Sequence, residues 1–81
     1  MDKPLKSDIE FYVINKVKEK RENANISQSE LAVRLEVSNG FIGQVESSKY
    51  PAKYNLNHIN KLSIIFNCSP KDFMPDNHLN E

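Results

Sequence analysis

The sequence predicts an all-α protein of five short helices, and three observations support this fold class. Apolar residues recur every three or four positions in successive segments, which is the period of a helix. A Ser precedes three of these segments with an acidic residue at the third position after it, as in the capping boxes Ser7…Glu10, Ser27…Glu30 and Ser69…Asp72. No segment shows the alternation of a strand. Short helices with tight connections favour a helical bundle.

The elements follow in order from these signals. The first helix begins after Ser7 and ends near Glu22, because Asn25 tolerates the left-handed conformation that closes a helix. The second follows Ser27, the third Ser38, and the fourth begins near Asn55 after a loop that contains Pro51. The expected segments are residues 8–22, 28 to about 36, 39–47, 55–66 and a short helix from Pro70 to Phe73. The residues expected to face inward are Ile9, Val13, Val17, Leu31, Ala32, Leu35, Phe41, Ile42, Val45, Leu56, Ile59, Leu62, Phe66 and Phe73.

The length and composition limit the class of protein. A chain of 81 residues predicts one small domain over residues 1–81, with a core over 8–74 and short ends. Eleven basic and eleven acidic residues cancel, so any attraction to nucleic acid must come from local clustering. The sequence has no apolar run of about 20 residues and no secretory signal pattern, so we expect a cytoplasmic protein that does not enter a membrane.

The chemistry-bearing residues point away from catalysis and metal binding. Cys68 is the single cysteine, and His58 and His78 are far from it and from each other in sequence. No carboxylate pair, nucleophile–base set or phosphate-cradling loop is present in the pattern. We therefore expect no enzyme activity, no metal site and no cofactor.

The second and third expected helices are separated by Glu36-Val37-Ser38, the spacing of a helix-turn-helix, with the small Ala32 where they cross. The run from Ile26 to Ala32, then Val37-Ser38, Ile42 and Val45-Glu46, resembles the Cro and phage-repressor type (Xre-like) helix-turn-helix family over residues 8–74. The resemblance implies a five-helix domain that binds operator DNA. Its helix 39–47 would lie in the major groove, and the helix after Ser27 would lie across the DNA backbone.

The resemblance also implies roles for individual residues. Gln28 matches a phosphate-contacting position, Asn39, Gly40 and Gln44 match base-reading positions, and Arg21 matches an arginine that pairs with the glutamate ending the third helix, here Glu46. Asn39 and Gln44 carry amides that can bond the N6 and N7 atoms of adenine. Lysines and a tyrosine in the following loop are ordinary phosphate donors, although a surface loop can also carry them by chance. The full expected DNA-contacting set is Ser27, Gln28, Ser38, Asn39, Gly40, Gly43, Gln44, Ser47, Lys49, Lys53 and Tyr54.

The sequence departs from the family pattern in its turns. Glu36 stands where Gly is usual, which implies either a non-Gly residue at positive φ or a shifted turn. Ser47-Ser48 stands where Asn-Gly is usual, and Lys20 replaces an apolar residue.

The two glycines of the chain, Gly40 and Gly43, both fall within the third expected helix. At 100° per residue they share its outward side with Gln44 and Ser47. Glycine there permits close approach of a surface such as DNA. The alternative is that an exposed position merely tolerates glycine.

Phe11, Ile14 and Ile64 project away from the expected core faces. Such a second apolar face indicates either a partner surface or cover by the C-terminal tail through Met74 and Leu79. Two functions follow. One is a sequence-specific DNA-binding regulator that acts on double-stranded DNA as a homodimer, because one such helix reads only a short half-site. The other is a protein-interaction module with a protein partner, such as the antitoxin of a toxin–antitoxin pair.

Overall fold

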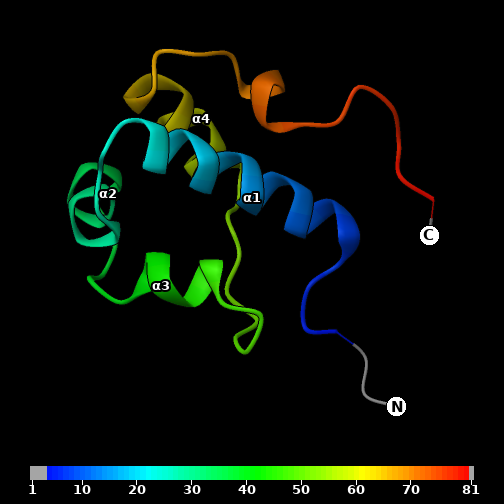
Figure 1. Ribbon diagram of the computed structural model, residues 1–81, viewed down its shortest axis with the longest axis horizontal. Helices are drawn as coiled ribbons and strands as arrows, with labels where there is room; N and C mark the ends of the chain where they lie inside the picture. Colours follow the sequence, from blue (N-terminus) through cyan, green and yellow to red (C-terminus); the bar gives the residue numbers. More distant parts are fainter. Residues whose placement is uncertain (1–3, 81) are drawn as a thin grey trace.

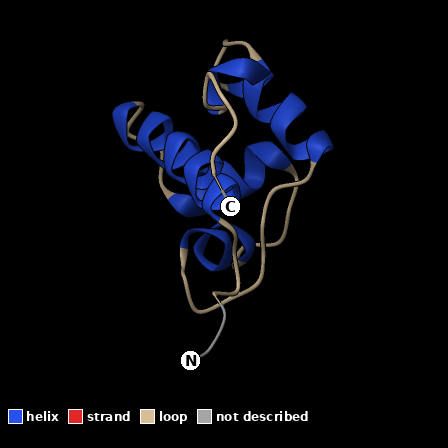
Figure 2. Ribbon diagram, turned by 90° about the vertical axis from the view of Figure 1, so that its right-hand side faces the viewer, coloured by secondary structure: helices blue, strands red, loops and turns tan. Residues whose placement is uncertain are grey.

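The computed structural model describes residues 4–80, and within them the chain forms helices and loops without strands (Figures 1 and 2). The elements are α1 (Asp8–Asn23), α2 (Gln28–Leu35), α3 (Phe41–Glu46), α4 (Leu56–Ile65) and a 3₁₀ helix, η1 (Pro70–Phe73). The predicted all-α class is therefore confirmed. None of the helices in the described part of the chain is long and apolar enough to cross a bilayer.

The prediction of five helices is wrong, because residues 4–80 contain four α-helices and the last predicted helix is η1. Pro70 occupies its first turn, and the backbone N–H of Met74 donates to the carbonyl of Lys71 three residues earlier. Pro75 follows and has no N–H with which to continue a helical ladder.

Capping side chains start the elements where the sequence predicts them. Ser7 and Ser69 form reciprocal capping boxes with Glu10 and Asp72, and the Ser27 hydroxyl accepts from the backbone N–H of Glu30. Asn25 adopts the left-handed conformation at φ 56°, as expected after α1.

The core lies between the helices and closes against η1. α1 packs against α3 and η1, while α2 packs against α3 and α4. The buried cluster consists of Val17, Ile26, Leu31, Ala32, Leu35, Ile42, Leu62 and Phe73. Three predictions of side-chain burial are wrong: Leu56, the first residue of α4, is 87% exposed and Ile9 is 36% exposed, whereas Ile14, expected on a second face, is buried. Leu56 lies where α4 emerges from the loop, before the helix reaches the core.

The connection between α2 and α3 combines a strained residue with a longer turn than predicted. Glu36 has φ 62°, and the N–H of Val37 donates to the carbonyl of Ala32, which closes α2 in the manner of a Schellman motif. α3 begins at Phe41 instead of residue 39, because Ser38, Asn39 and Gly40 form a turn in which the Ser38 carbonyl accepts from the Phe41 N–H. It ends at Glu46, so the predicted helix 39–47 is shorter at both ends.

Candidate nucleic-acid interface

The outer side of α3 and the turn before it present polar groups to solvent. Asn39 and Gln44 are exposed, as are Ser38 and Gly40. Gly40 caps α3 at negative φ, and a Cβ added there would meet nothing within 4 Å. Its predicted place inside the helix is thus wrong, although its exposure agrees with the prediction. The amides of Asn39 and Gln44 suit the edge of a base in shape and in donor and acceptor chemistry.

Beneath this face, α3 is tied to α1 by a bidentate ion pair. The Arg21 Nε and Nη2 atoms donate to the two carboxylate oxygens of Glu46, each at 2.9 Å, and Nη1 donates to the Ile26 carbonyl at 2.9 Å. The two side chains are only 10% and 4% exposed. The hydrogen bonds to Glu46 raise the pKa of the Arg21 guanidinium above its ordinary value. The pair expected from the sequence is therefore present and fixes the roll of α3 against α1.

Gln28 extends the same network from the start of α2. Its Nε2 donates to Glu46 at 3.0 Å, and its Oε1 lies 3.3 Å from the place where a Cβ on Gly43 would stand. Gly43 is half-buried. The close approach at Gly43 is therefore made by the side chain of Gln28, whereas the prediction placed this glycine on the outward side of the helix for close approach of a surface such as DNA. Ser27, exposed beside it, uses its hydroxyl to cap α2.

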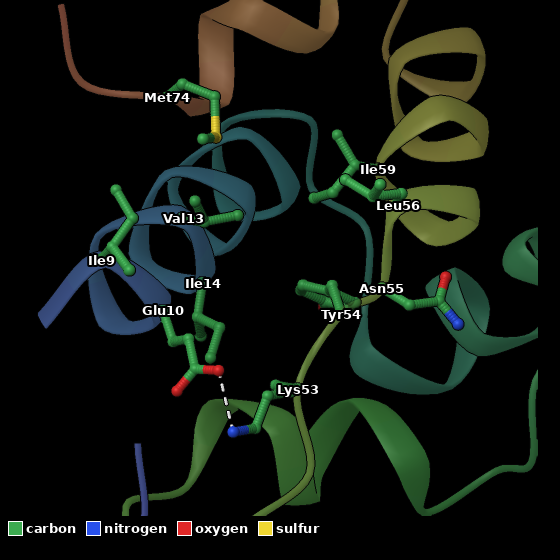
Figure 3. Close-up of a pocket in the computed structure, with 10 residues that line it drawn as sticks. All are labelled: Ile9, Glu10, Val13, Ile14, Lys53, Tyr54, Asn55, Leu56, Ile59 and Met74. Atoms are coloured by element: carbon green, nitrogen blue, oxygen red, sulfur yellow. Dashed lines mark ion pairs between the residues drawn. The ribbon is translucent and has the colours of Figure 1, made fainter. Parts of the chain in front are cut away.

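The predicted phosphate donors in the loop over residues 47–55 lie in three different environments. Lys49 is exposed, and its backbone N–H donates to the hydroxyl of the half-buried Ser47 at 3.2 Å. Lys53 instead forms an ion pair with Glu10 of α1 at 2.8 Å (Figure 3). The Tyr54 hydroxyl is buried without a hydrogen-bond partner in the described part of the chain. Tyr54 thus does not present a phosphate donor at the surface, contrary to the prediction.

The ring of Tyr54 belongs to an aromatic cluster that joins α3 to α4. Its centroid lies 6.3 Å from that of Phe41, the first residue of α3, and 6.1 Å from that of His58. Phe41 and His58 are 5.2 Å apart. His58 also completes a capping box with Asn55, and burial lowers its pKa. His58 is half-buried in this cluster, which the loop over residues 47–55 completes.

Lys6 is a buried charge that the sequence reasoning missed. Its side chain crosses from the segment before α1 to the C-terminal end of α3, where Nζ donates to the carbonyls of Gln44, Val45 and Ser47. Lys6 is 2% exposed. Burial, followed by repulsion from Lys53, lowers the pKa of its ammonium, while Glu10 acts in the opposite direction. No local pattern around Lys6 marks this contact.

A helix-turn-helix family model matches residues 17–73 of the chain, from the middle of α1 to the end of η1. The chain belongs to the helix-turn-helix family of the Cro and phage-repressor type. This confirms the resemblance carried by residues 26–46. No curated protein and no solved structure matches the chain. The family is one of DNA-binding domains and is not usually enzymatic.

This helix-turn-helix protein also carries an apolar groove between α1, α4 and the end of η1 (Figure 3). It has a volume of about 370 Å³ and adjoins the exposed Leu56 and the half-exposed Met74. Of the predicted second face, Ile64 is 73% exposed, so the C-terminal tail does not cover it. The groove is lined by Ile9, Glu10, Val13, Ile14, Lys53, Tyr54, Asn55, Leu56, Ile59 and Met74.

Proposed function

We propose that this protein is a sequence-specific DNA-binding transcriptional regulator that places α3 in the major groove. The observation that carries the proposal is the exposed polar side of α3, with Gln44 at its centre, on a helix held from beneath by the Arg21–Glu46–Gln28 network. A base-reading helix must be fixed within a fraction of an ångström of its productive position. The family membership supports the same conclusion.

Eight of the eleven predicted DNA-contacting residues have a place in this proposal, and Gly43, Ser47 and Tyr54 do not. Asn39 and Gln44 read base edges, while Gly40 leaves space at the start of α3 for the DNA to approach. Lys49 and the exposed hydroxyls of Ser27 and Ser38 meet phosphates. Gln28 acts by holding Glu46, and Lys53 by pairing with Glu10.

The active species in this proposal is a homodimer on double-stranded DNA. One recognition helix covers a short half-site, and two copies related by a two-fold axis read both halves. The apolar groove, with Leu56 87% exposed at its edge, is a surface that a second copy could cover.

The same groove favours a second candidate function, a protein-interaction module such as an antitoxin that binds a protein partner. An exposed apolar surface of this kind marks protein binding whether or not DNA is also bound. In that case α3 need not discriminate between DNA sequences.

Selection of oligonucleotides from a random pool separates the two functions. The regulator enriches one sequence motif, and its affinity for that operator exceeds its affinity for random DNA by roughly 10³-fold or more. Substitution Leu56→Glu then tests the dimer, because it should lower the sedimenting mass and the operator affinity together. Recovery of no motif would reject the regulator and leave the interaction module.

A further inference from the structure

α3 receives little stabilisation from its own sequence. It has six residues, no side-chain cap at its N-terminus and no basic residue in its last turn. By contrast, Ser7, Ser27, Asn55 and Ser69 cap the other helical elements that the structure describes. A helix this short is marginal unless tertiary contacts support it, and the carbonyls of its last turn need donors.

Lys6 supplies these donors from outside the helix. An ammonium has three N–H groups, and the structure gives Lys6 three carbonyl partners, on Gln44, Val45 and Ser47. A positive charge is also favoured by the dipole at the C-terminal end of a helix. The position of Lys6 is set by the next residue, because Ser7 begins α1 with its capping box.

We propose that Lys6 is a positioning residue for DNA recognition, which fixes the backbone that carries Gln44 and so sets the direction of the base-reading side chain. The inference rests on the proposed function of α3. Lys6 lies outside residues 17–73, which the family model matches.

Two observations separate this role from a direct phosphate contact. Lys6 is 2% exposed, and its three donors all point at carbonyls of the protein. A lysine that contacts a phosphate increases the salt slope of DNA binding by about one unit, whereas a positioning residue does not change this slope. Loss of Lys6 should therefore weaken specific binding while leaving the electrostatic part of binding unchanged.

The experiment compares Lys6→Met with Lys71→Met. Both remove one lysine charge, but Lys71 is exposed on η1. We expect Lys6→Met to bind the selected operator at least about tenfold more weakly than Lys71→Met, as for loss of one well-placed base contact. Affinity for random DNA and the salt slope should be the same in the two variants. Amide hydrogen exchange in α3 should rise in Lys6→Met while exchange in α1 and α4 stays unchanged.

Equal operator affinity in the two variants would overturn the proposal, and so would a salt slope lower by about one unit in Lys6→Met alone. If Lys6→Met does not fold, reductive dimethylation of the wild-type protein decides: Lys6 should be protected relative to Lys71 with and without operator, and equal reactivity rejects the contact. If the wild type selects no operator, the proposed function fails by itself. In that case α3 exchange in Lys6→Met still shows whether Lys6 holds the helix.

Discussion

The buried hydroxyl of Tyr54 lowers the stability of the fold, and one substitution can remove it. It has no hydrogen-bond partner within residues 4–80, and an unpaired buried hydroxyl costs roughly 1–3 kcal/mol. Tyr54→Phe keeps the ring in its cluster with Phe41 and His58. We expect the free energy of unfolding to rise by about 1 kcal/mol in urea titrations, with operator affinity unchanged. A loss of affinity would return Tyr54 to the DNA-contacting set.

Tyr54→Phe should also differ from the wild type in how its stability changes at alkaline pH. Burial raises the pKa of Tyr54 above its ordinary value of 10.0, so above that pH the unfolded chain releases a proton that the folded protein keeps. Stability from this group is full below pH 10 and declines as the pH rises further. The difference in free energy of unfolding between Tyr54→Phe and wild type should therefore grow above pH 10. Lys6 also titrates in this range, but its effect on stability is the same in both proteins and cancels in the difference.

Lys49 and Lys53 provide a matched pair for the phosphate contacts. Both side chains are exposed, but Lys53 is paired with Glu10 at 2.8 Å. In titrations of DNA at several salt concentrations, Lys49→Ala should lower the salt slope by about one unit and weaken binding to all sequences alike. Lys53→Ala should change the slope by less. Equal changes would place both side chains on phosphates and would mean that the pair with Glu10 opens on binding.

Among the contacts between helices, the Arg21–Glu46 pair joins α1 to α3. The pair is bidentate and nearly buried, so removal of one partner leaves a charge without compensation. Arg21→Ala and Glu46→Ala should each lower the free energy of unfolding by about 3 kcal/mol, and the double variant should cost less than their sum. Chemical denaturation of the four proteins of this cycle measures the coupling. Additive effects would reject the pair as a unit.

The start of α4 should make the fold sensitive to mild acid. Nδ1 of His58 accepts from the Asn55 N–H, which requires a neutral ring, and burial lowers the His58 pKa below its ordinary 6.5. The unfolded chain therefore takes up the proton more readily, and stability falls as the pH drops through 6.5.

His58→Gln provides the comparison, because glutamine at this position of a capping box accepts the same bond without titrating. We expect Tm to fall between pH 7 and pH 5 in the wild type and to stay nearly constant in His58→Gln. This window lies above the acidic range in which Glu10 loses its charge, since the pKa of Glu10 is lowered by its bond to Lys53. Parallel curves of Tm against pH for the wild type and His58→Gln would contradict the role of the capping box.

At the scale of the whole molecule, the sequence predicted what depends on near neighbours. Capping boxes and the left-handed Asn25 follow from residues within a few positions of one another, and the positive φ of Glu36 is one of the two alternatives that the sequence of the turn left open. The contacts that orient α3 instead join residues that are far apart in the sequence. Lys6 reaches carbonyls 38 to 41 residues away, and the Tyr54 cluster needs the loop to return to α3. The Arg21–Glu46 pair was expected only because the family resemblance supplied it.

The length of α3 shows the same limit. Periodicity extended it over residues 39–47, but the structure uses Ser38 to Gly40 as a turn and leaves six helical residues. Helical spacing alone does not reveal a turn whose residues also fit the helical pattern. The proposed reading surface therefore lies on a short helix, which three groups hold in place: Lys6, the Arg21–Glu46–Gln28 network and the cluster around Phe41.

The proposed function depends above all on base reading by Gln44 on α3. The most direct measurement is the affinity of wild type and Gln44→Ala for the selected operator, for each single-base variant of it and for random DNA. If Gln44 contacts a base, Gln44→Ala should lose roughly 1–3 kcal/mol of discrimination at one base pair and keep its affinity for random DNA. An equal fall in specific and non-specific binding, or unchanged discrimination at every position, would contradict it.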